Sequence, residues 1–112
     1  MKFYDEDVMG KIRETLEAEV LGWPGVSSRP MMGCLCYFRG SSFFAFLVNG
    51  GVVLTKLTEE QRLDMVGNVP TQQSNLGGKR LPKTWITVAV KNSADLKKVL
   101  PYIRKGYENV SA

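Results

Sequence analysis

The sequence predicts a small α+β protein with an antiparallel or mixed sheet and helices packed against it. Segments with apolar residues three and four positions apart lie near both ends of the chain, and a stretch rich in aromatic and branched residues, broken by glycine turns, follows the first. A length of 112 residues suits one domain with its own core. Apolar residues make up 44% of the chain and charged residues 23%, as in ordinary folded proteins, so we expect one domain over residues 1–112.

The first predicted element is an amphipathic helix over residues 5–21. Asp5 and Asp7 lie at its start, where carboxylates can accept hydrogen bonds from free amides and oppose the helix dipole. Its apolar residues recur mainly every four positions and predict one buried face: Val8, Ile12, Leu16 and Val20, with Met9 alongside.

Residues 26–57 have the composition of β-strands, and three turn signals divide them into as many as four strands. The turns contain Gly33, Gly40 and the run Asn49-Gly50-Gly51. The last of these predicts a tight hairpin between residues 43–48 and 52–57, because asparagine and glycine adopt the positive φ that such turns require.

Every residue from 43 to 48 is apolar, so both faces of this strand need cover. Simple alternation assigns the residues to two opposite faces: Phe44, Phe46 and Val48 on one, and Phe43, Ala45 and Leu47 on the other. Each large side chain left in water would forfeit about 1.5 to 3 kcal/mol. We expect helices on one face, and a loop, a further helix or a second subunit on the other.

The second half of the chain predicts a short helix, an irregular region, a last strand and a final helix. Thr58 and Gln61 have the spacing of a capping box, which predicts a helix from residue 59 to about 66. Residues 67–83 form the longest irregular stretch and residues 84–90 the last strand. Asn92 or Ser93 caps the final helix, and we expect Pro101 to kink or break it.

The sequence lacks the residues for ordinary catalysis, and it predicts neither an enzyme nor a cofactor. It contains no histidine, which excludes Ser/His/Asp and Cys/His arrangements. Cys34 and Cys36 alternate along a predicted strand, so they point the same way and are expected to be free, buried thiols. A zinc site would need four ligands, which only a dimer that pooled two such pairs could supply.

Positive charge is concentrated after residue 28. Residues 1–28 contain three basic and six acidic side chains, a net charge of −3, and the rest contain twelve basic and five acidic, a net charge of +7. Lysines and arginines in the irregular region and along the final helix predict a candidate surface for an anion or a partner, to which Arg29 and Lys56 are added. The candidate residues are Arg29, Lys56, Lys79, Arg80, Lys83, Lys97, Lys98, Arg104 and Lys105.

The expected location is the cytoplasm, without a membrane anchor. No stretch approaches the roughly 18 to 20 consecutive apolar residues of a membrane span. The first seven residues are acidic where a signal peptide would be basic and then apolar.

The order and spacing of several motifs resemble the TfoX N-terminal domain family. The block Arg29-Pro30-Met31-Met32-Gly33-Cys34 is similar to the family's opening Arg-x-Met-Phe-Gly-Gly, with Met32 in place of phenylalanine and Cys34 in place of the second glycine. The later Leu54-x-Lys56, the strand from Trp85 to Val88 and the run from Leu100 to Lys105 also match, so the resemblance covers about residues 26–107.

This resemblance implies a five-stranded antiparallel sheet flanked by N- and C-terminal helices, an architecture similar to that of type III secretion chaperones, which often form dimers. It brings no catalytic or cofactor residues. The family is named after a regulator of natural competence, and its longer members carry a second domain, which we do not expect in this chain.

Three functional hypotheses follow from the sequence. The first is a non-enzymatic interaction or regulatory domain, expected to be a homodimer, that binds another protein. The second is a nucleic-acid-associated regulator that contacts phosphates through the basic loop and the last helix. The third is a small-molecule or anion site beneath residues 67–83, near Arg29 and Lys56.

Overall fold

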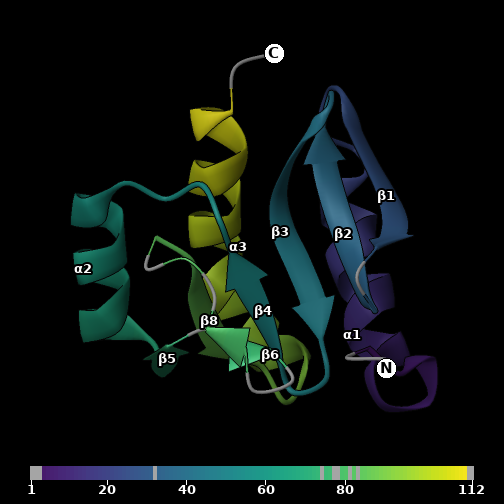
Figure 1. Ribbon diagram of the computed structural model, residues 1–112. Coiled ribbons are helices and arrows are strands. Elements are labelled where there is room, and N and C mark those ends of the chain that lie inside the picture. Colours follow the sequence, from purple (N-terminus) through teal and green to yellow (C-terminus); the bar gives the residue numbers. More distant parts are fainter. Residues whose placement is uncertain are drawn as a thin grey trace.

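Six strands form one antiparallel sheet in the computed structural model, which describes residues 4–31, 33–73, 75–76, 79–80, 82 and 84–110 (Figure 1). The helices are α1 (Glu6–Val20), α2 (Glu59–Asn68) and α3 (Ser93–Asn109). The strands are β1 (Val26–Met31), β2 (Cys34–Arg39), β3 (Ser42–Val48), β4 (Gly51–Leu54), β5 (Thr71–Gln73), β6 (Asn75–Leu76), β7 (Lys79–Arg80) and β8 (Ile86–Ala89).

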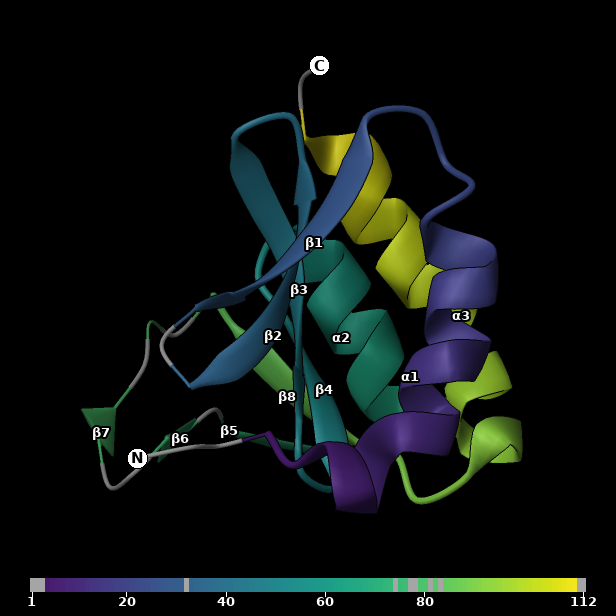
Figure 2. The same ribbon diagram turned by 90° about the vertical axis from the view of Figure 1, so that its right-hand side faces the viewer.

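The strand order in the large sheet is β1-β2-β3-β4-β8-β5, and β6 pairs only with β7. The predicted α+β class is therefore confirmed, and β1 to β4 and β8 are the five expected strands. The sixth, β5, is a three-residue edge strand that pairs with β8 inside the region predicted to be irregular. Figure 2 shows the three helices on one side of the large sheet and β6 and β7 on the other.

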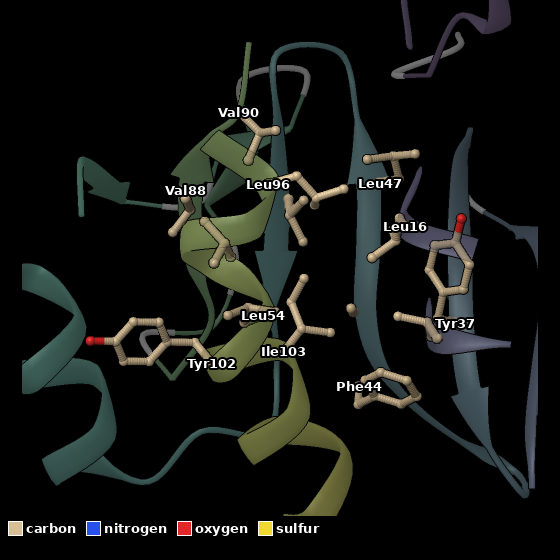
Figure 3. Close-up of a cluster of buried hydrophobic side chains, with 14 of the residues drawn as sticks. Leu16, Tyr37, Phe44, Leu47, Leu54, Val88, Val90, Leu96, Tyr102 and Ile103 are labelled. Atoms are coloured by element: carbon tan, nitrogen blue, oxygen red, sulfur yellow. The ribbon is translucent and has the colours of Figure 1, made fainter. Parts of the chain in front are cut away.

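The helical side of the sheet carries the larger core. Leu16 from α1, Tyr37 and Phe44 from the sheet, and Leu96 and Ile103 from α3 are nearly or fully excluded from solvent, and Figure 3 shows them converging between sheet and helices. Burial of about 1.5 to 3 kcal/mol per large side chain makes this face the main source of stability.

A second apolar cluster covers the opposite face of β2, β3 and β4. Its buried members are Cys34, Cys36, Phe38, Phe46, Val48 and Val53. Phe43, Met31 and Trp85 pack against it, with ring centroids 4.8 Å apart for Phe43 and Phe46 and 5.2 Å apart for Phe46 and Trp85. Both faces of β3 are thus buried within a single chain, so the apolar strand does not require a second subunit for its cover.

The predicted alternation along β3 is wrong at its start. The register with β2 shifts so that Tyr37 lies opposite Ala45 and Phe38 opposite Phe43, which leaves Phe44 as the extra residue of a β-bulge. The shift turns Phe44 toward the helices, where Ala45 and Leu47 also lie, while Phe43, Phe46 and Val48 join the second cluster.

Thr55 is polar but buried beside this bulge, where it donates hydrogen bonds to two backbone carbonyl groups of the bulge. Its backbone N–H donates to the Phe44 carbonyl over 3.3 Å, and its Oγ1 donates to the Phe43 carbonyl over 3.1 Å. Buried backbone oxygens without such donors would be costly, so Thr55 stabilises the irregular register.

Helix α1 begins after Asp5, whose side chain accepts a hydrogen bond from the Asp7 amide. Met9, Ile12, Leu16 and Val20 are its buried residues, whereas Val8 is 62% exposed, so the prediction for Val8 is wrong. A four-residue spacing drifts by about 40° per step around a helix of 3.6 residues per turn, and this drift carries Val8 off the buried face.

The other two helices have the predicted caps. The capping box of Thr58 and Gln61 starts α2, and Asn92 caps α3 by accepting from the Asp95 amide. The expected break at Pro101 does not occur, because α3 runs unbroken through this exposed position. Buried residues on both sides, Val99 and Ile103, hold the helix against the sheet, which offsets the loss of one backbone hydrogen bond.

The turn between β3 and β4 provides a test of the sheet geometry. A Cβ at Gly51 would lie 2.4 Å from the Val88 carbonyl oxygen, whereas a Cβ at Gly50 would meet no atom within 4 Å. We expect Gly51→Ala to lower the free energy of unfolding by more than about 2 kcal/mol, because β4 and β8 must separate.

Gly50→Ala is the matched control for this experiment. Gly50 has a φ of 79°, so an alanine there brings backbone strain of about 1 kcal/mol without a clash. Urea unfolding monitored by tryptophan fluorescence measures both variants. Equal losses for the two would contradict the close approach of β4 and β8.

Candidate functional site

The most exposed apolar pair in the described chain lies on α2. Leu63 is 67% exposed and Val66 is 57% exposed. Residues three and four apart share a helix face, so their neighbours there are Glu59, Glu60 and Gly67, which are also exposed. We call these five residues the outer face of α2.

The opposite side of α2 is anchored in the core. Met65 is fully buried and Val69, just after the helix, is 8% exposed. The Arg62 Nη1 donates to the Leu57 carbonyl over 2.8 Å, which joins the start of the helix to the chain before it. With its inner side held in this way, α2 cannot rotate to bury Leu63 and Val66 without exposing Met65.

Polar contacts with α3 further fix the position of α2. The Tyr102 hydroxyl donates to Asp64 over 2.8 Å and accepts from the Asn68 amide over 3.3 Å, and Figure 3 shows the Tyr102 ring reaching toward α2. Burial and the bond to Asp64 raise the pKa of Tyr102. At the other end of α2, the Asn109 side chain donates to Gln61 Oε1 over 2.7 Å.

The predicted basic residues do not form one surface. Arg29 and Lys56 lie on the side of the second cluster, where the Arg29 guanidinium is 4.4 Å from the Phe38 ring centroid and the Lys56 ammonium 5.5 Å from that of Phe43. Lys79 and Arg80 form β7, which Figure 2 shows on this same side. Lys83 lies outside the described residues.

The remaining predicted residues lie on α3, across the sheet. Lys97 and Lys98 are exposed, and neither has an ion pair with a residue that the structure describes. Arg104 pairs with Glu108 over 3.3 Å and stacks on the rings of Trp23 and Tyr107. Lys105 is half-buried over the Tyr102 ring. The sheet therefore separates the basic loop from the basic helix.

Two hollows lined by described residues lie at the start of α1. One has a volume of about 480 Å³ between Tyr4, Pro30 and Asn49, and the other about 580 Å³ between α1 and Lys91. Carboxylates line both, but Glu6 is paired with Arg13, which lowers its pKa, and Asp5 caps the helix. Neither hollow is lined by Arg29 or Lys56. The loop of residues 67–83, beneath which the sequence predicted an anion site, lies partly outside the described residues.

The two cysteines are buried in the second cluster, as expected, and no disulfide joins them. Burial raises the pKa of both thiols, that of Cys36 to about 12, and the neighbouring Cys34 contributes to the shift at Cys36. Cys36 Sγ lies 3.7 Å from the Met31 carbonyl oxygen. Among the residues that the structure describes, no group of three or more His, Cys, Asp or Glu side chains is arranged to hold a metal ion.

The exposure of Leu63 and Val66 was not predicted from the sequence, although the sequence contains one signal of it. Three apolar residues, Leu63, Met65 and Val66, fall in a helix of ten residues and are spread around its circumference. Only one side of such a helix can face the sheet, so at least one apolar residue had to remain outside.

Comparison with protein-family models, with curated proteins and with solved structures finds no match for this chain. The fold defines the class: an α+β protein whose antiparallel sheet is covered by helices on one side. None of the helices described is both long and apolar enough to span a membrane.

The raised thiol pKa values predict a loss of stability at alkaline pH. The pKa of Cys36 in the folded state lies above the unfolded value of about 9, so the native thiol stays protonated at pH values where the unfolded thiol has ionised. The free energy of unfolding therefore keeps its full value below pH 9 and falls as the pH rises toward about 12. Each such thiol lowers the free energy of unfolding by up to about 1.4 kcal/mol per pH unit in this range.

Urea unfolding at pH 8, 9 and 10 measures this slope. Cys36→Ala should lower stability at pH 8 by about 1 kcal/mol through the lost packing but flatten the fall between pH 9 and 10. An unchanged slope in the variant, or rapid labelling of the native thiols by a disulfide reagent at pH 8, would show that the thiols are not buried as described.

Proposed function

We propose that this protein is a non-enzymatic interaction domain of regulatory type, which forms a homodimer and binds other proteins through the outer face of α2. The observation that carries this proposal is the exposure of Leu63 and Val66, side by side on a helix that cannot turn them inward. Covering the two side chains with a partner would contribute about 1 to 2 kcal/mol each.

The chemistry of the polar groups favours binding over catalysis. The chain has no histidine, and the thiolate forms of both cysteines are disfavoured by burial. Several carboxylates already have structural partners: Glu17 accepts from Tyr37, Asp64 from Tyr102, and Asp95 from the Lys91 amide. Two cysteines that form no disulfide with each other also fit the proposed cytoplasmic location.

The exposed apolar pair on α2, rather than the sheet, now favours a homodimer. Both faces of β3 are buried within the chain, so the two-sided apolar strand no longer favours a dimer. The resemblance to the TfoX N-terminal domain family remains a second, independent motive for this proposal.

Substitution of the outer face tests the proposed function. Leu63→Gln with Val66→Gln should leave stability within about 0.5 kcal/mol, because both positions are exposed. Val8→Gln, at a similarly exposed position on α1, is the control. In affinity capture from extracts of the source cells, we expect partners held by the wild type and by Val8→Gln to be lost with the double variant. Capture that does not depend on Leu63 and Val66 would contradict the proposal.

A second candidate function is binding to nucleic-acid phosphates through α3. Lys97 and Lys98 are exposed without an ion pair among the described residues, in the part of the chain with a net charge of +7. Arg104 and Lys105 lie about two turns further along but are engaged with aromatic rings. The separation of α3 from β7 by the sheet limits the surface to the helix itself.

Titration of a labelled DNA duplex at several salt concentrations tests this second candidate. If α3 contacts phosphates, affinity should fall with salt, and Lys97→Gln with Lys98→Gln should reduce the slope of log K against log salt by about 2. Lys11→Gln with Lys56→Gln, two exposed lysines elsewhere, should leave the slope unchanged. Absence of binding, or equal effects of the two double variants, would exclude α3 as the contact.

A further inference from the structure

We propose that Met31, Cys34 and Cys36 form a binding site for one Cu(I) ion on the face of the sheet opposite the helices. This face is on the other side of the sheet from α2, so the site goes beyond the proposed function and can be tested separately from it. The proposal rests on the donor atoms, their spacing, the neighbouring charge and a route of entry.

The pairing of β1 with β2 brings three sulfur-containing side chains to one place. Met31 lies directly opposite Cys34, and Cys36 follows two residues later on the same strand. Opposite residues of an antiparallel pair have Cβ atoms about 5 Å apart, and residues two apart on a strand share a face at a distance of about 6.5 Å. Both cysteines are buried in the second cluster and Met31 packs against it. The three sulfur atoms therefore belong to the same small patch.

The spacing of the two cysteines suits a bridging ion better than a disulfide. A disulfide needs Cβ atoms about 3.8 Å apart, which two residues of one extended strand do not reach. An ion held between the two sulfur atoms spans a larger gap. The Cys36 Sγ also lies 3.7 Å from the Met31 carbonyl oxygen, so this thiol leans toward the strand that supplies the third sulfur.

The set of donors selects Cu(I) among the metals that bind sulfur. Thiolates and thioethers are soft ligands, which favour Cu(I), zinc and iron–sulfur clusters. Structural zinc sites and iron–sulfur clusters take four protein ligands. Among the residues that the structure describes, no third His, Cys, Asp or Glu side chain is placed to join the two cysteines in a metal site. Cu(I) is satisfied by two or three sulfur donors, and methionine is one of them.

A positive side chain lies beside the thiols, where a copper–thiolate group requires one. Two thiolates around one Cu(I) leave one negative charge, which is costly in apolar surroundings unless it is compensated. Arg29 is paired with Cys36 across the two strands, and its guanidinium lies 4.4 Å from the ring centroid of Phe38 in the same cluster. Burial raises the pKa of Cys36, and the charge of Arg29 partly opposes this effect. Arg29 therefore favours the thiolate form that binds the metal.

Binding involves no change in oxidation state. The two thiol protons leave to solvent, both thiolates form bonds to Cu(I), and the uncharged Met31 thioether supplies a third bond. Apolar neighbours, among them Phe46, Val48 and Val53, surround the thiols. Cu(II) prefers nitrogen and oxygen ligands in a tetragonal arrangement, so these surroundings favour the reduced ion.

The ion has a route to the site. Cys34 lines the hollow of about 480 Å³ at the start of α1, and Asp5, Glu6 and Asp7 line the same hollow. Carboxylates at an entrance raise the local concentration of cations. Because Cys34 is only 2% exposed, this opening suits a single ion better than a larger reagent.

Titration with Cu(I) under anaerobic conditions tests the proposal on the full chain. The protein competes for the ion with bicinchoninate, whose Cu(I) complex is coloured, so loss of colour reports the copper that the protein binds. We expect one Cu(I) per chain and a new ultraviolet absorption from thiolate-to-copper charge transfer. Cys34→Ala and Cys36→Ala should each weaken binding more than about a hundredfold, because losing a direct ligand costs more than the roughly 10- to 100-fold effect of an outer partner.

Two milder substitutions keep the test independent of folding, and each has a matched control. Met31→Leu removes the thioether at a half-buried position and should weaken binding about tenfold, whereas Met65→Leu, at a buried methionine on α2, should not. Arg29→Gln should also weaken binding about tenfold, whereas Lys56→Gln, at an exposed lysine on the same side, should not. Urea unfolding establishes that each variant is folded.

Three outcomes would overturn the proposal. The first is a protein that takes no Cu(I) from bicinchoninate, or takes it equally well without Cys34 or Cys36. The second is an equal effect of Met31→Leu and Met65→Leu, which would remove the thioether from the site. The third is binding of one metal ion per two chains, of Cu(I) or of Zn(II), which would show that two chains pool their cysteines. The dependence of partner capture on Leu63 and Val66 is measured independently, so the proposed function stands or fails on its own.

Discussion

Burial of β3 on both faces is the constraint on which the rest of the structure depends. All but the first of its residues are apolar, so the sheet must be covered on each side before the chain is stable. Three helices cover one side, and the cluster around Phe46 and Cys36 occupies the other. The bulge at Phe44 divides the side chains between the two cores, and Thr55 satisfies the carbonyls that the bulge leaves out of register.

The position of α2 follows from this arrangement through a chain of contacts. A Cβ at Gly106 would lie only 3.7 Å from the Phe44 carbonyl oxygen, so α3 lies close against the bulge. Arg39 donates to the Tyr107 and Val110 carbonyls and holds the end of α3 to β2. Tyr102 and Asn109 then extend from α3 to α2. The exposure of Leu63 and Val66 is thus a consequence of how the core is packed.

The two kinds of surface on this protein have different origins. Lysines outside an apolar helix face keep α3 soluble, and several basic side chains are drawn onto aromatic rings, as Arg104 is onto Trp23. On the outer face of α2, in contrast, Leu63 and Val66 remain largely exposed to solvent. A contact with another protein is the simplest physical role for an apolar pair that the fold holds in solvent.

The sequence by itself determined the α+β class, the element order, the glycine turns and the helix caps, because these depend on local spacing and on a few side chains, such as Thr58 with Gln61. Tertiary structure decided the rest. The bulge at Phe44, the exposure of Val8, the continuation of α3 through Pro101 and the separation of the basic residues by the sheet all depend on packing between distant segments. Leu63 and Val66 belong to this second group, since helix periodicity shows which residues share a face but not which face meets the core.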